Sequence, residues 1–347
     1  MRIAIVAGTD VGLVRRNNED NFIICSDLSA SEWTIPQIGS ESDLGKFGAL
    51  LFVADGMGGA NAGEVASAIA VESIHEAFHK QSLADVILSE DAIVNFLKDT
   101  LREADLKVLH HAQEDKSTQG MGTTAVIAWV LNDKAYICWC GDSRCYVFNH
   151  HIGLTQLTKD HSYVQELVDK GELSPENALD HPYSNIITQC LGDTSKRVKP
   201  DICIYTLKEK DTLLLCTDGL CGVCHDEQIL DVMDSCQDDL ADTKNQLIQE
   251  ALTNGGYDNV TVVLCQVQMD DADGDKLIKS SLDMTVKSNV SPKRHTVFWI
   301  ILLIMIIALV GFSLYLYLEQ PEEFDLIINK FLSYYENVKN FVVTCFG

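Results

Sequence analysis

Short apolar runs recur through most of the chain, and their lengths are typical of β-strands. The run Leu50-Leu51-Phe52-Val53-Ala54 is apolar at every position, which indicates a buried strand. A run of the same kind lies at Leu213-Leu214-Leu215-Cys216, and another at Val260-Thr261-Val262-Val263-Leu264. On this basis strands are expected at residues 3–7, 22–26, 49–54, 123–129, 135–140, 145–148, 212–216 and 259–267.

Two stretches between these runs follow a helical period instead. Apolar residues recur at three- and four-residue spacing from Ala66 to Phe78 and again from Val94 to Val108, and we interpret both stripes as core-facing sides of helices. Two long consecutive helices followed by hairpins favour an α+β fold, a sheet sandwich with helices packed outside. Residues 27–46, with Pro36 and several Gly and Ser, are expected to form an inserted loop.

The C-terminal region has a different pattern. Residues 297–318 carry no charge and are long enough, at about 1.5 Å per residue, to cross a hydrocarbon core of about 30 Å as one transmembrane helix. Lys287, Lys293 and Arg294 precede this span and acidic residues follow it, so the large N-terminal region is expected on the cytoplasmic side. No signal peptide is evident at the N-terminus. Residues 269–295 are interpreted as a flexible linker, and 319–347 as an amphipathic tail on the opposite side.

Charge and cysteine usage narrow the class of protein. The formal net charge is −25, from 51 acidic and 26 basic residues, which argues against nucleic acid as a partner. The 12 cysteines are irregularly spaced and several lie inside apolar runs, which favours a reducing compartment. Cys221-Gly-Val-Cys224 has CxxC spacing, but no second pair accompanies it, so a zinc or redox role is not favoured.

Candidate chemistry is concentrated in four acidic segments. They are Arg15-Arg-Asn-Asn-Glu-Asp20, Asp55-Gly-Met-Gly-Gly59, Thr217-Asp-Gly219 and Gly255-Gly-Tyr-Asp-Asn259. Taken singly, each is better explained by a strand that stops at an Asp-Gly turn. Taken together, they place carboxylates at strand ends that are distant in sequence, which is the arrangement that a pair of hard divalent cations needs.

These segments, with others between them, resemble the metal-dependent protein phosphatases of the protein phosphatase 2C type (the PPM family) in their bacterial form. The resemblance runs from about residue 3 to residue 267 and follows the family's motif order. Its motifs are Arg15-x-x-Asn-Glu-Asp-Asn21, Asp55-Gly-Met-Gly-Gly59, Gly120-Met-Gly-Thr-Thr124, Gly141-Asp-Ser-Arg144, Leu157-Thr-Lys-Asp-His-Ser162, Ile187-Thr-Gln-Cys-Leu-Gly192, Thr217-Asp-Gly-Leu220 and Asp258-Asn-Val-Thr261.

The resemblance implies a fold and a division of the chain. The fold would be a four-layer αββα sandwich of two central sheets flanked by helix pairs. Residues 1–268 would form the phosphatase domain, with 162–189 as a flap over the site. The implied activity is hydrolysis of phosphoserine and phosphothreonine in proteins, opposing a Ser/Thr kinase, by in-line attack of a water that bridges two Mn²⁺ or Mg²⁺ ions.

The resemblance also implies individual roles. Asp55 would bridge the two ions and Gly56 would offer its backbone carbonyl to one, while Asp218 and Asp258 would complete the protein ligands of the other. Glu19 and Asp20 would hold metal-bound waters. Asp142 matches a ligand of an additional, third ion, and its alternative is an ordinary hairpin-turn Asp. Arg15 matches the phosphate clamp, since a planar guanidinium can grip two phosphoryl oxygens.

One position departs from the family pattern. Met57 stands where many eukaryotic members have a histidine that is a proposed general acid, and a thioether cannot donate a proton. A water would then have to protonate the leaving group, or His161 would; His161 is more simply explained as a residue that caps or orients the following helix.

Two other functions are compatible with parts of the sequence, a nucleotide hydrolase and a phosphoprotein-binding scaffold. A nucleotide hydrolase is excluded because no Gly-x-x-x-x-Gly-Lys-[Ser/Thr] motif occurs in the sequence. A catalytically weak, membrane-bound scaffold that binds phosphoproteins stays as the alternative, to be distinguished by hydrolysis of p-nitrophenyl phosphate.

Overall fold

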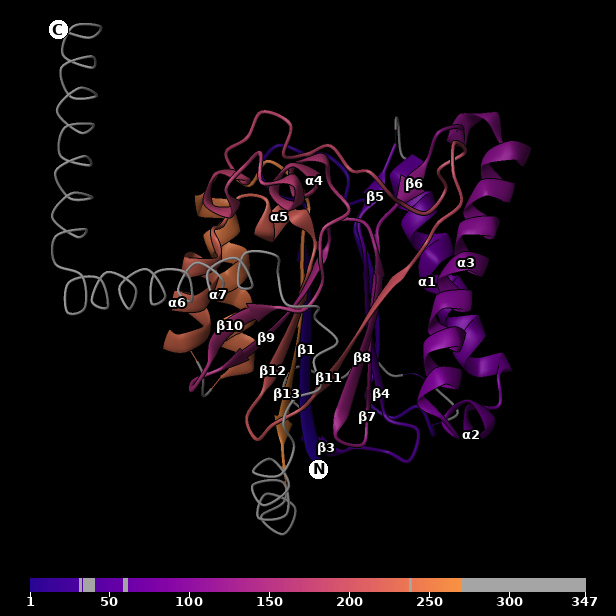
Figure 1. Cartoon of the computed structure of the whole chain (residues 1–347), viewed down its shortest axis with the longest axis vertical. Coiled ribbons are helices and arrows are strands. Elements are labelled where there is room, and N and C mark those ends of the chain that lie inside the picture. The colour runs from indigo at the N-terminus through magenta and orange to yellow at the C-terminus, as the bar shows by residue number, and fades with distance from the viewer. Residues whose placement is uncertain (31–32, 34–40, 59–61, 237–238, 270–347) are drawn as a thin grey trace, which may run out of the picture. The chain divides into compact units, whose positions relative to one another are not determined.

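The structure is a computed structural model that describes residues 1–30, 33, 41–58, 62–236 and 239–269. The chain divides into two compact units, Met1–Leu277 and Ile278–Gly347, and all described residues belong to the first. Two antiparallel sheets stand face to face at the centre of this unit, with helices on its outer sides (Figure 1).

The first sheet has six strands and the second has five. In spatial order the first contains β10 (Gly153–Gln156), β9 (Arg144–Asn149), β12 (Thr212–Cys216), β13 (Val260–Gln268), β1 (Arg2–Asp10) and β3 (Glu41–Asp43). The second contains β11 (Asp201–Thr206), β8 (Lys134–Cys140), β7 (Ala125–Leu131), β4 (Ala49–Ala54) and β2 (Asn21–Cys25). A two-stranded ribbon, β5 (Gly56–Met57) with β6 (Gly122–Thr123), continues from the end of β4.

The continuous apolar runs follow from burial of both sheet faces. On β4, Leu51 and Val53 point into the core between the sheets, whereas Leu50 and Phe52 pack under the helices. Successive side chains of a strand alternate between faces, so a strand buried on both faces must be apolar at every position. Each of these four side chains is 0 % exposed.

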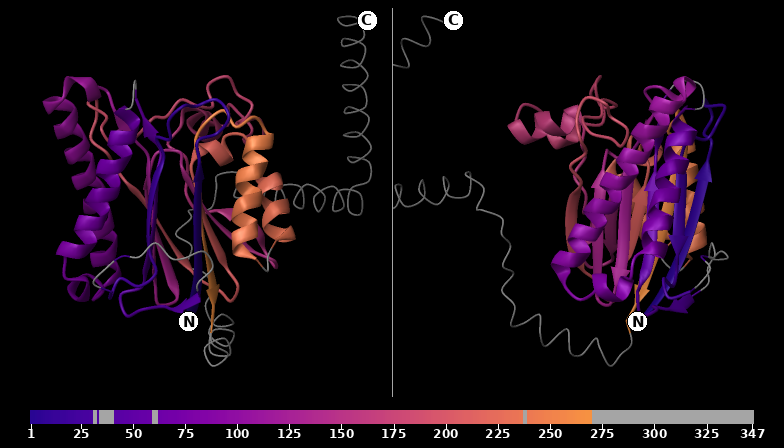
Figure 2. Two further views of the ribbon diagram at one scale, coloured as in Figure 1. Left: turned by 180° about the vertical axis from the view of Figure 1, so that it is seen from behind. Right: turned by 90° about the vertical axis from the view of Figure 1, so that its right-hand side faces the viewer.

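Helix pairs cover the two outer faces, as the views in Figure 2 show. α1 (Ala62–Lys80) and α3 (Glu90–Glu114) pack on the five-stranded sheet, while α6 (Asp226–Ser235) and α7 (Leu240–Thr253) pack on the six-stranded one. The remaining helices are short: α2 (Leu83–Val86), α4 (Tyr163–Lys170), α5 (Asp218–Cys221) and the 3-10 turns Lys116–Thr118 and Pro175–Asn177. The predicted α+β sandwich with flanking helices is confirmed.

The structure differs from the sequence prediction in several local features, among them the helices α4, α6 and α7, which the two predicted helical stripes did not include. The segment 27–46, predicted as a loop, contains the strand β3, which pairs with β1 at Arg2–Ala4. The strands β10 and β11, both sheet edges, were not predicted. Polar residues interrupt the apolar pattern of β10, whereas β11 carries the apolar run Ile202-Cys-Ile-Tyr205, which the prediction overlooked. The cap of α4 is Ser162, whose hydroxyl accepts a hydrogen bond from the Gln165 amide, so His161 does not cap that helix.

Among the described residues, no helix combines the length and the apolar character that crossing a bilayer requires. The predicted span 297–318, the tail 319–347 and all but the first residue of the linker 269–295 lie outside the described residues.

Candidate active site

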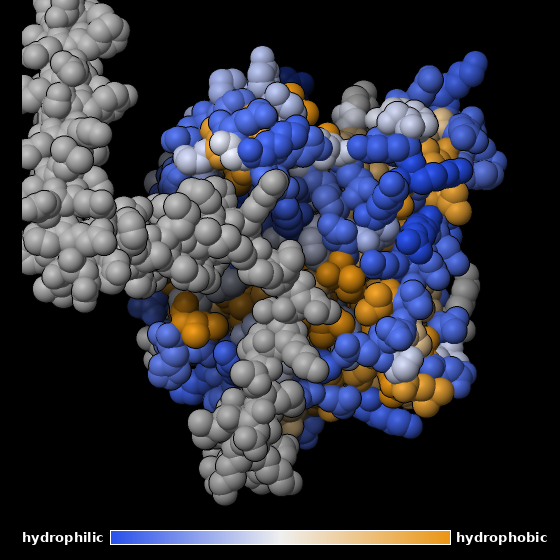
Figure 3. Space-filling view, in the orientation of Figure 1, coloured by the Kyte–Doolittle hydropathy of each residue, from blue (hydrophilic) through white to orange (hydrophobic). Residues whose placement is uncertain are grey.

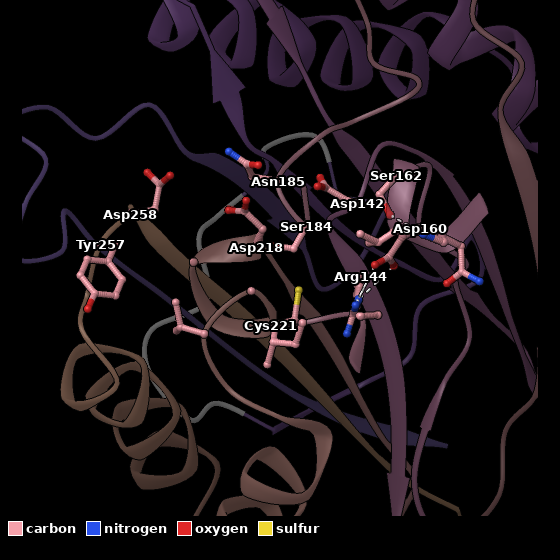
Figure 4. A pocket seen from close by; sticks show the side chains of 17 residues that line it. Asp142, Arg144, Asp160, Ser162, Ser184, Asn185, Asp218, Cys221, Tyr257 and Asp258 are labelled. Atoms are coloured by element: carbon pink, nitrogen blue, oxygen red, sulfur yellow. Dashed lines mark hydrogen bonds and ion pairs between the residues drawn. The ribbon is translucent and has the colours of Figure 1, made fainter. Parts of the chain in front are cut away.

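The acidic segments meet at one end of the sandwich. Asp55 follows β4, Asp142 lies in the turn between β8 and β9, Asp218 begins α5 directly after β12, and Asp258 precedes β13. Because neighbouring strands are antiparallel, the end of β12 lies beside the start of β13, and the start of β2 beside the end of β4. Figure 4 shows Asp218 between Asp258 on one side and Asp142 on the other.

Asp20 is held at the base of this group by two hydroxyl groups. Its Oδ2 accepts a hydrogen bond from Thr217 Oγ1 at 2.8 Å and another from Thr261 Oγ1 at 2.7 Å. Thr217 and Thr261 lie next to each other on the paired ends of β12 and β13. The Asp20 side chain is therefore fixed by both strands that position Asp218 and Asp258.

The four innermost carboxyl groups, which we call the carboxylate cluster, are Asp20, Asp55, Asp142 and Asp218. Burial raises the pKa of each. The negative charge of other cluster members raises the pKa of Asp20, Asp55 and Asp142 further, and the charge of Asp258 does the same for Asp218. The pKa of Asp20 rises to about 7. Asp55 and Asp218 also share a hydrogen bond. Buried carboxyl groups that lie this close together repel one another when charged, so they indicate a binding site for cations.

A second observation supports this interpretation. Buried Oδ1 atoms of Asp20, Asp142 and Asp218 have no hydrogen-bond partner among the described residues. Buried polar atoms normally have partners, and unpaired carboxylate oxygens are the ligands that Mg²⁺ and Mn²⁺ prefer. In the described part of the chain, no three His, Cys, Asp or Glu side chains surround a single point. Mg²⁺ is commonly bound by one or two carboxylates and keeps several waters, so the cluster fits such ions.

The backbone at Asp55 and Gly56 is fixed tightly. The Asp55 amide donates to Thr124 Oγ1 at 2.9 Å, and its carbonyl accepts from the Thr124 amide at 2.9 Å. A Cβ on Gly56 would lie 2.2 Å from the Gly63 carbonyl oxygen, so no larger residue fits there without a shift of the chain. Glycine at this position lets β5 run directly beneath α1.

Arg15 lies at the outer side of the site. Its Nη2 donates to Asp258 Oδ2 at 2.6 Å, and its side chain is 51 % exposed. Glu19, whose pKa burial raises, lies near both residues. The structure thus brings together all the residues predicted for the site: Arg15, Glu19, Asp20, Asp55, Gly56, Asp142, Asp218 and Asp258. Their individual roles stay predictions.

Asn259 organises the segment that carries Arg15, and the sequence interpretation assigned it no role. Its Oδ1 accepts from the Glu19 amide at 2.8 Å, while its Nδ2 donates to the carbonyls of Val11 and Asn17, each at 2.9 Å. One buried amide side chain therefore fixes the loop before β2 at three points. The motif Asp258-Asn-Val-Thr261 was the available signal.

A partly buried ion pair, Arg144 with Asp160, forms the other wall of the site, and the sequence analysis did not predict it. Arg144 donates through Nε and Nη2 to both oxygens of Asp160, at 2.9 Å and 2.7 Å. Both residues line a cavity of about 260 Å³, together with Asp142, Asp218 and Asp258. Residues of the segment 162–189 line the same cavity, including Val164, Leu179 and Asn185. Arg144 and Asp160 lie within the Gly141 and Leu157 motifs, which were the available signal for this wall.

The structure disfavours His161 as a general acid. Its Nδ1 accepts from the Gly141 amide at 3.1 Å, its Nε2 lies 3.3 Å from Asp201 Oδ2, and its ring stacks on Trp139. These contacts orient the chain before α4, and His161 does not line the cavity. Cys221 and Cys224 are buried in the core around α5, and burial is a cause of the raised pKa of each thiol.

A two-sheet sandwich with carboxylates converging at its strand ends suits a metal-dependent hydrolase, and comparison with known proteins shows the family to which the chain belongs. The family model for protein phosphatase 2C matches residues 42–254. The serine/threonine phosphatase stp of Listeria monocytogenes is 35 % identical over 258 residues, which cover 74 % of this chain and 93 % of that protein.

Solved structures agree. The serine/threonine phosphatase of S. agalactiae superposes with a TM-score of 0.65 at 30 % identity, covering 77 % of this chain and 100 % of that one. The catalytic domain of the phosphatase PstP, solved in complex with 2 manganese ions, superposes with a TM-score of 0.61 at 30 % identity, covering 78 % and 100 %. The chain belongs to the protein phosphatase 2C family. It is therefore a protein-serine/threonine phosphatase of the metal-dependent class that uses Mn²⁺ or Mg²⁺.

Proposed function

We propose that this phosphatase binds two divalent cations at the carboxylate cluster and hydrolyses phosphoserine and phosphothreonine there. Asp55 would lie between the two ions, the Gly56 carbonyl would bind one, and Asp218 and Asp258 the other. Glu19 and Asp20 would act through water. The observation that carries this assignment is the set of buried, unpartnered oxygens on Asp20, Asp142 and Asp218. The two manganese ions in the PstP complex support it.

The chemistry divides between the ions and the protein. A pair of such cations, when bound, supplies an acidified water and neutralises charge on the phosphoryl oxygens. The protein's part is to hold the carboxylates at fixed positions before any substrate arrives. The Thr217 and Thr261 hydroxyls hold the Asp20 carboxylate, and the Thr124 hydroxyl holds the backbone amide of Asp55. Preorganised charge costs no rearrangement during the reaction.

Arg15 is proposed to hold the phosphoryl group. Its guanidinium has N–H donors beyond the one that meets Asp258, and it is half exposed at the mouth of the site. A planar guanidinium binds two phosphoryl oxygens at once. The short Arg15–Asp258 contact also links the phosphate-binding residue to a proposed metal ligand, so the two would respond to each other.

The leaving oxygen is proposed to take its proton from water. Met57 cannot donate one, and both ring nitrogens of His161 face other groups. Asp160 is engaged by Arg144. Asp142 is proposed as a ligand of a third ion shared with Asp218. Two observations support this: its Oδ1 has no hydrogen-bond partner among the described residues, and the charge of Asp218 adds to burial in raising the pKa of Asp142.

The C-terminal region is proposed to anchor the enzyme in a membrane. The charge-free segment 297–318 and the basic residues before it support a single span with the phosphatase domain in the cytoplasm. There it would oppose a Ser/Thr kinase that acts on proteins at the same membrane. A protease added to intact cells should spare residues 1–294 and trim only the tail after Glu319, whereas cleavage within the phosphatase domain would reverse the topology.

The catalytic proposal is tested by metal removal. The purified chain should hydrolyse phosphoserine and phosphothreonine peptides and p-nitrophenyl phosphate with Mn²⁺ or Mg²⁺, and EDTA should stop all three reactions reversibly. Full activity in EDTA contradicts the two-ion site. Binding of phosphopeptides with no hydrolysis under any metal condition would favour the scaffold function instead.

A further inference from the structure

Exposed apolar side chains gather around the active site. The face drawn in Figure 3 is mostly hydrophilic, in keeping with the net charge of −25. Among the described residues, large apolar side chains are nevertheless exposed on the segment that leads to Arg15, on the flap and next to Asp258: Val11, Leu13, Val14, Tyr163, Tyr183, Ile186 and Tyr257. Fewer lie elsewhere, namely Leu88, Leu106, Ile152 and Ile204.

Three of these side chains lie directly beside proposed catalytic residues, and we call them the apolar rim: Leu13, Val14 and Tyr257. They are 68 %, 62 % and 64 % exposed. Val14 immediately precedes Arg15, and Tyr257 immediately precedes Asp258. Arg15 and Asp258 form the ion pair at the mouth, so the rim comes from the two segments that this pair joins.

The two segments are locked together by backbone contacts. The Leu13 amide donates to the Gly256 carbonyl at 2.7 Å. Gly256 has a φ of +52°, and a Cβ there would lie 2.9 Å from Leu13 Cγ, so the Leu13 side chain covers this glycine. These contacts hold Leu13 in place beside Tyr257, with most of its side chain still exposed.

The rim continues into the cavity. Tyr257 lines the cavity, and Figure 4 places it beside Asp258 on the side away from Asp142. The flap contributes Val164 and Leu179 to the lining of the same cavity, and Val223 lines it from the turn after α5. A phosphorylated side chain that reaches Arg15 and Asp218 must therefore bring its neighbouring residues against apolar surface.

We propose that the apolar rim binds the residues flanking the phosphoserine or phosphothreonine of a protein substrate, and selects substrates with a large apolar residue one to three positions from the phosphorylated one. The proposal rests on the function proposed above, because it takes the phosphoryl group to lie at Arg15. An extended peptide advances about 3.3 Å per residue, so such a neighbour reaches the rim. A small phosphate ester has no such neighbouring residue.

The experiment uses the full-length chain with Mn²⁺ in mild detergent and three substrates: a phosphothreonine peptide with Leu at the flanking positions, the same peptide with Ser there, and p-nitrophenyl phosphate. The double variant Leu13→Ser with Tyr257→Ser should lower kcat/KM for the Leu peptide about tenfold more than for the other two substrates. Leu88→Ser is the matched control, since Leu88 is 79 % exposed at a distance from the cavity lining. The conservative pair Leu13→Met with Tyr257→Phe should restore the preference.

The outcomes separate this inference from the proposed function. A wild-type enzyme that hydrolyses none of the substrates contradicts the proposed function. An active enzyme that treats both peptides alike, or a double variant that loses activity equally on all three substrates, contradicts the rim alone. A rim that instead joins two copies of the chain would make the wild type, but not the double variant, sediment as a dimer with unchanged peptide preference, and this too would overturn the proposal.

Discussion

Two groups of buried carboxylates show how the same side chain can serve folding or chemistry. Asp105 on α3 and Asp211 before β12, which we call the structural carboxylates, are 2 % and 0 % exposed. Asp105 accepts a hydrogen bond from the Gly192 amide at 2.8 Å, and Asp211 accepts from Asn149 Nδ2 and the Lys208 amide, each at 2.7 Å. In the carboxylate cluster, by contrast, three Oδ1 atoms have no partner among the described residues.

The difference lies in what surrounds each group. Burial raises the pKa of both kinds of carboxyl, but donors offset that effect for the structural carboxylates, while neighbouring carboxyls increase it in the cluster. A buried carboxylate without donors costs stability. Cations that bind at the cluster should therefore raise the stability of the folded protein. At Asp105, hydrogen-bond donors of the protein already fulfil this role.

The largest expected effect is on kcat, when one carboxyl charge is removed from the cluster and, for comparison, one from the structural carboxylates. Asp55→Asn should lower kcat by at least about 10³-fold, because the residue proposed to hold both ions is lost. Asp258→Asn should lower kcat less. Asp105→Asn, the matched control, should leave kcat near the wild-type value, because Asp105 does not line the cavity and its carboxyl contacts the Gly192 amide and Arg197. Steady-state kinetics at saturating Mn²⁺ measure all three, and equal losses for Asp55→Asn and Asp105→Asn would remove the distinction.

Metal ions should stabilise the folded protein by binding at the carboxylate cluster and not at the structural carboxylates. Raising Mn²⁺ to about 100 times its dissociation constant should add about 2.7 kcal/mol to the free energy of unfolding of the wild type. Asp218→Asn should lose most of this gain, whereas Asp211→Asn should keep it while lowering the metal-free stability. Urea melts with EDTA or Mn²⁺ give both values. A gain that persists in Asp218→Asn would show that the ions bind elsewhere.

The strand ends of the cluster were predictable because their signals are local. Each of Asp55, Asp218 and Asp258 lies within two residues of an apolar run that forms a buried strand. The order of the motifs, and the family resemblance that it carries, then predicted that these strand ends lie together at one end of the sandwich. The single apolar runs could not predict this. The edge strand β10 was missed because a strand paired on one side needs no continuous apolar pattern. The edge strand β11 does contain an apolar run, Ile202-Cys-Ile-Tyr205, and this signal was overlooked.

The supporting contacts were harder to predict. Asn259 bonds to residues more than two hundred positions earlier, and Arg144 meets Asp160 across a hairpin. Such pairs depend on the register between strands, which the pattern of apolar residues does not specify in detail. The motifs indicated that these residues matter, but their partners became known only from the structure.

A third prediction concerns Arg15, which lies at the exposed side of the site, outside the carboxylate cluster. Arg15→Ala should raise KM for p-nitrophenyl phosphate about tenfold with little change in kcat, because a residue that grips the ground state contributes uniform binding. Arg15→Lys should recover only part of the loss, since an ammonium cannot bind two oxygens in the same plane. A fall in kcat at constant KM would mean that Arg15 acts on the transition state instead.

The smallest expected effect concerns the structural carboxylates and pH. Burial raises the pKa of Asp105 above its ordinary value of 3.8, so the folded state keeps this proton to higher pH than the unfolded state does. Its contribution to stability is therefore complete below pH 3.8 and is lost as the pH rises through the folded-state pKa. The slope can reach at most about 1.4 kcal/mol per pH unit. Asp105→Asn removes this proton, so the difference in unfolding free energy between wild type and variant should fall as pH rises, in EDTA, where the cluster titrates alike in both proteins. A difference that stays constant or grows would mean that the Gly192 amide and Arg197 outweigh burial at Asp105, and that the two groups of carboxylates differ less than their partners indicate.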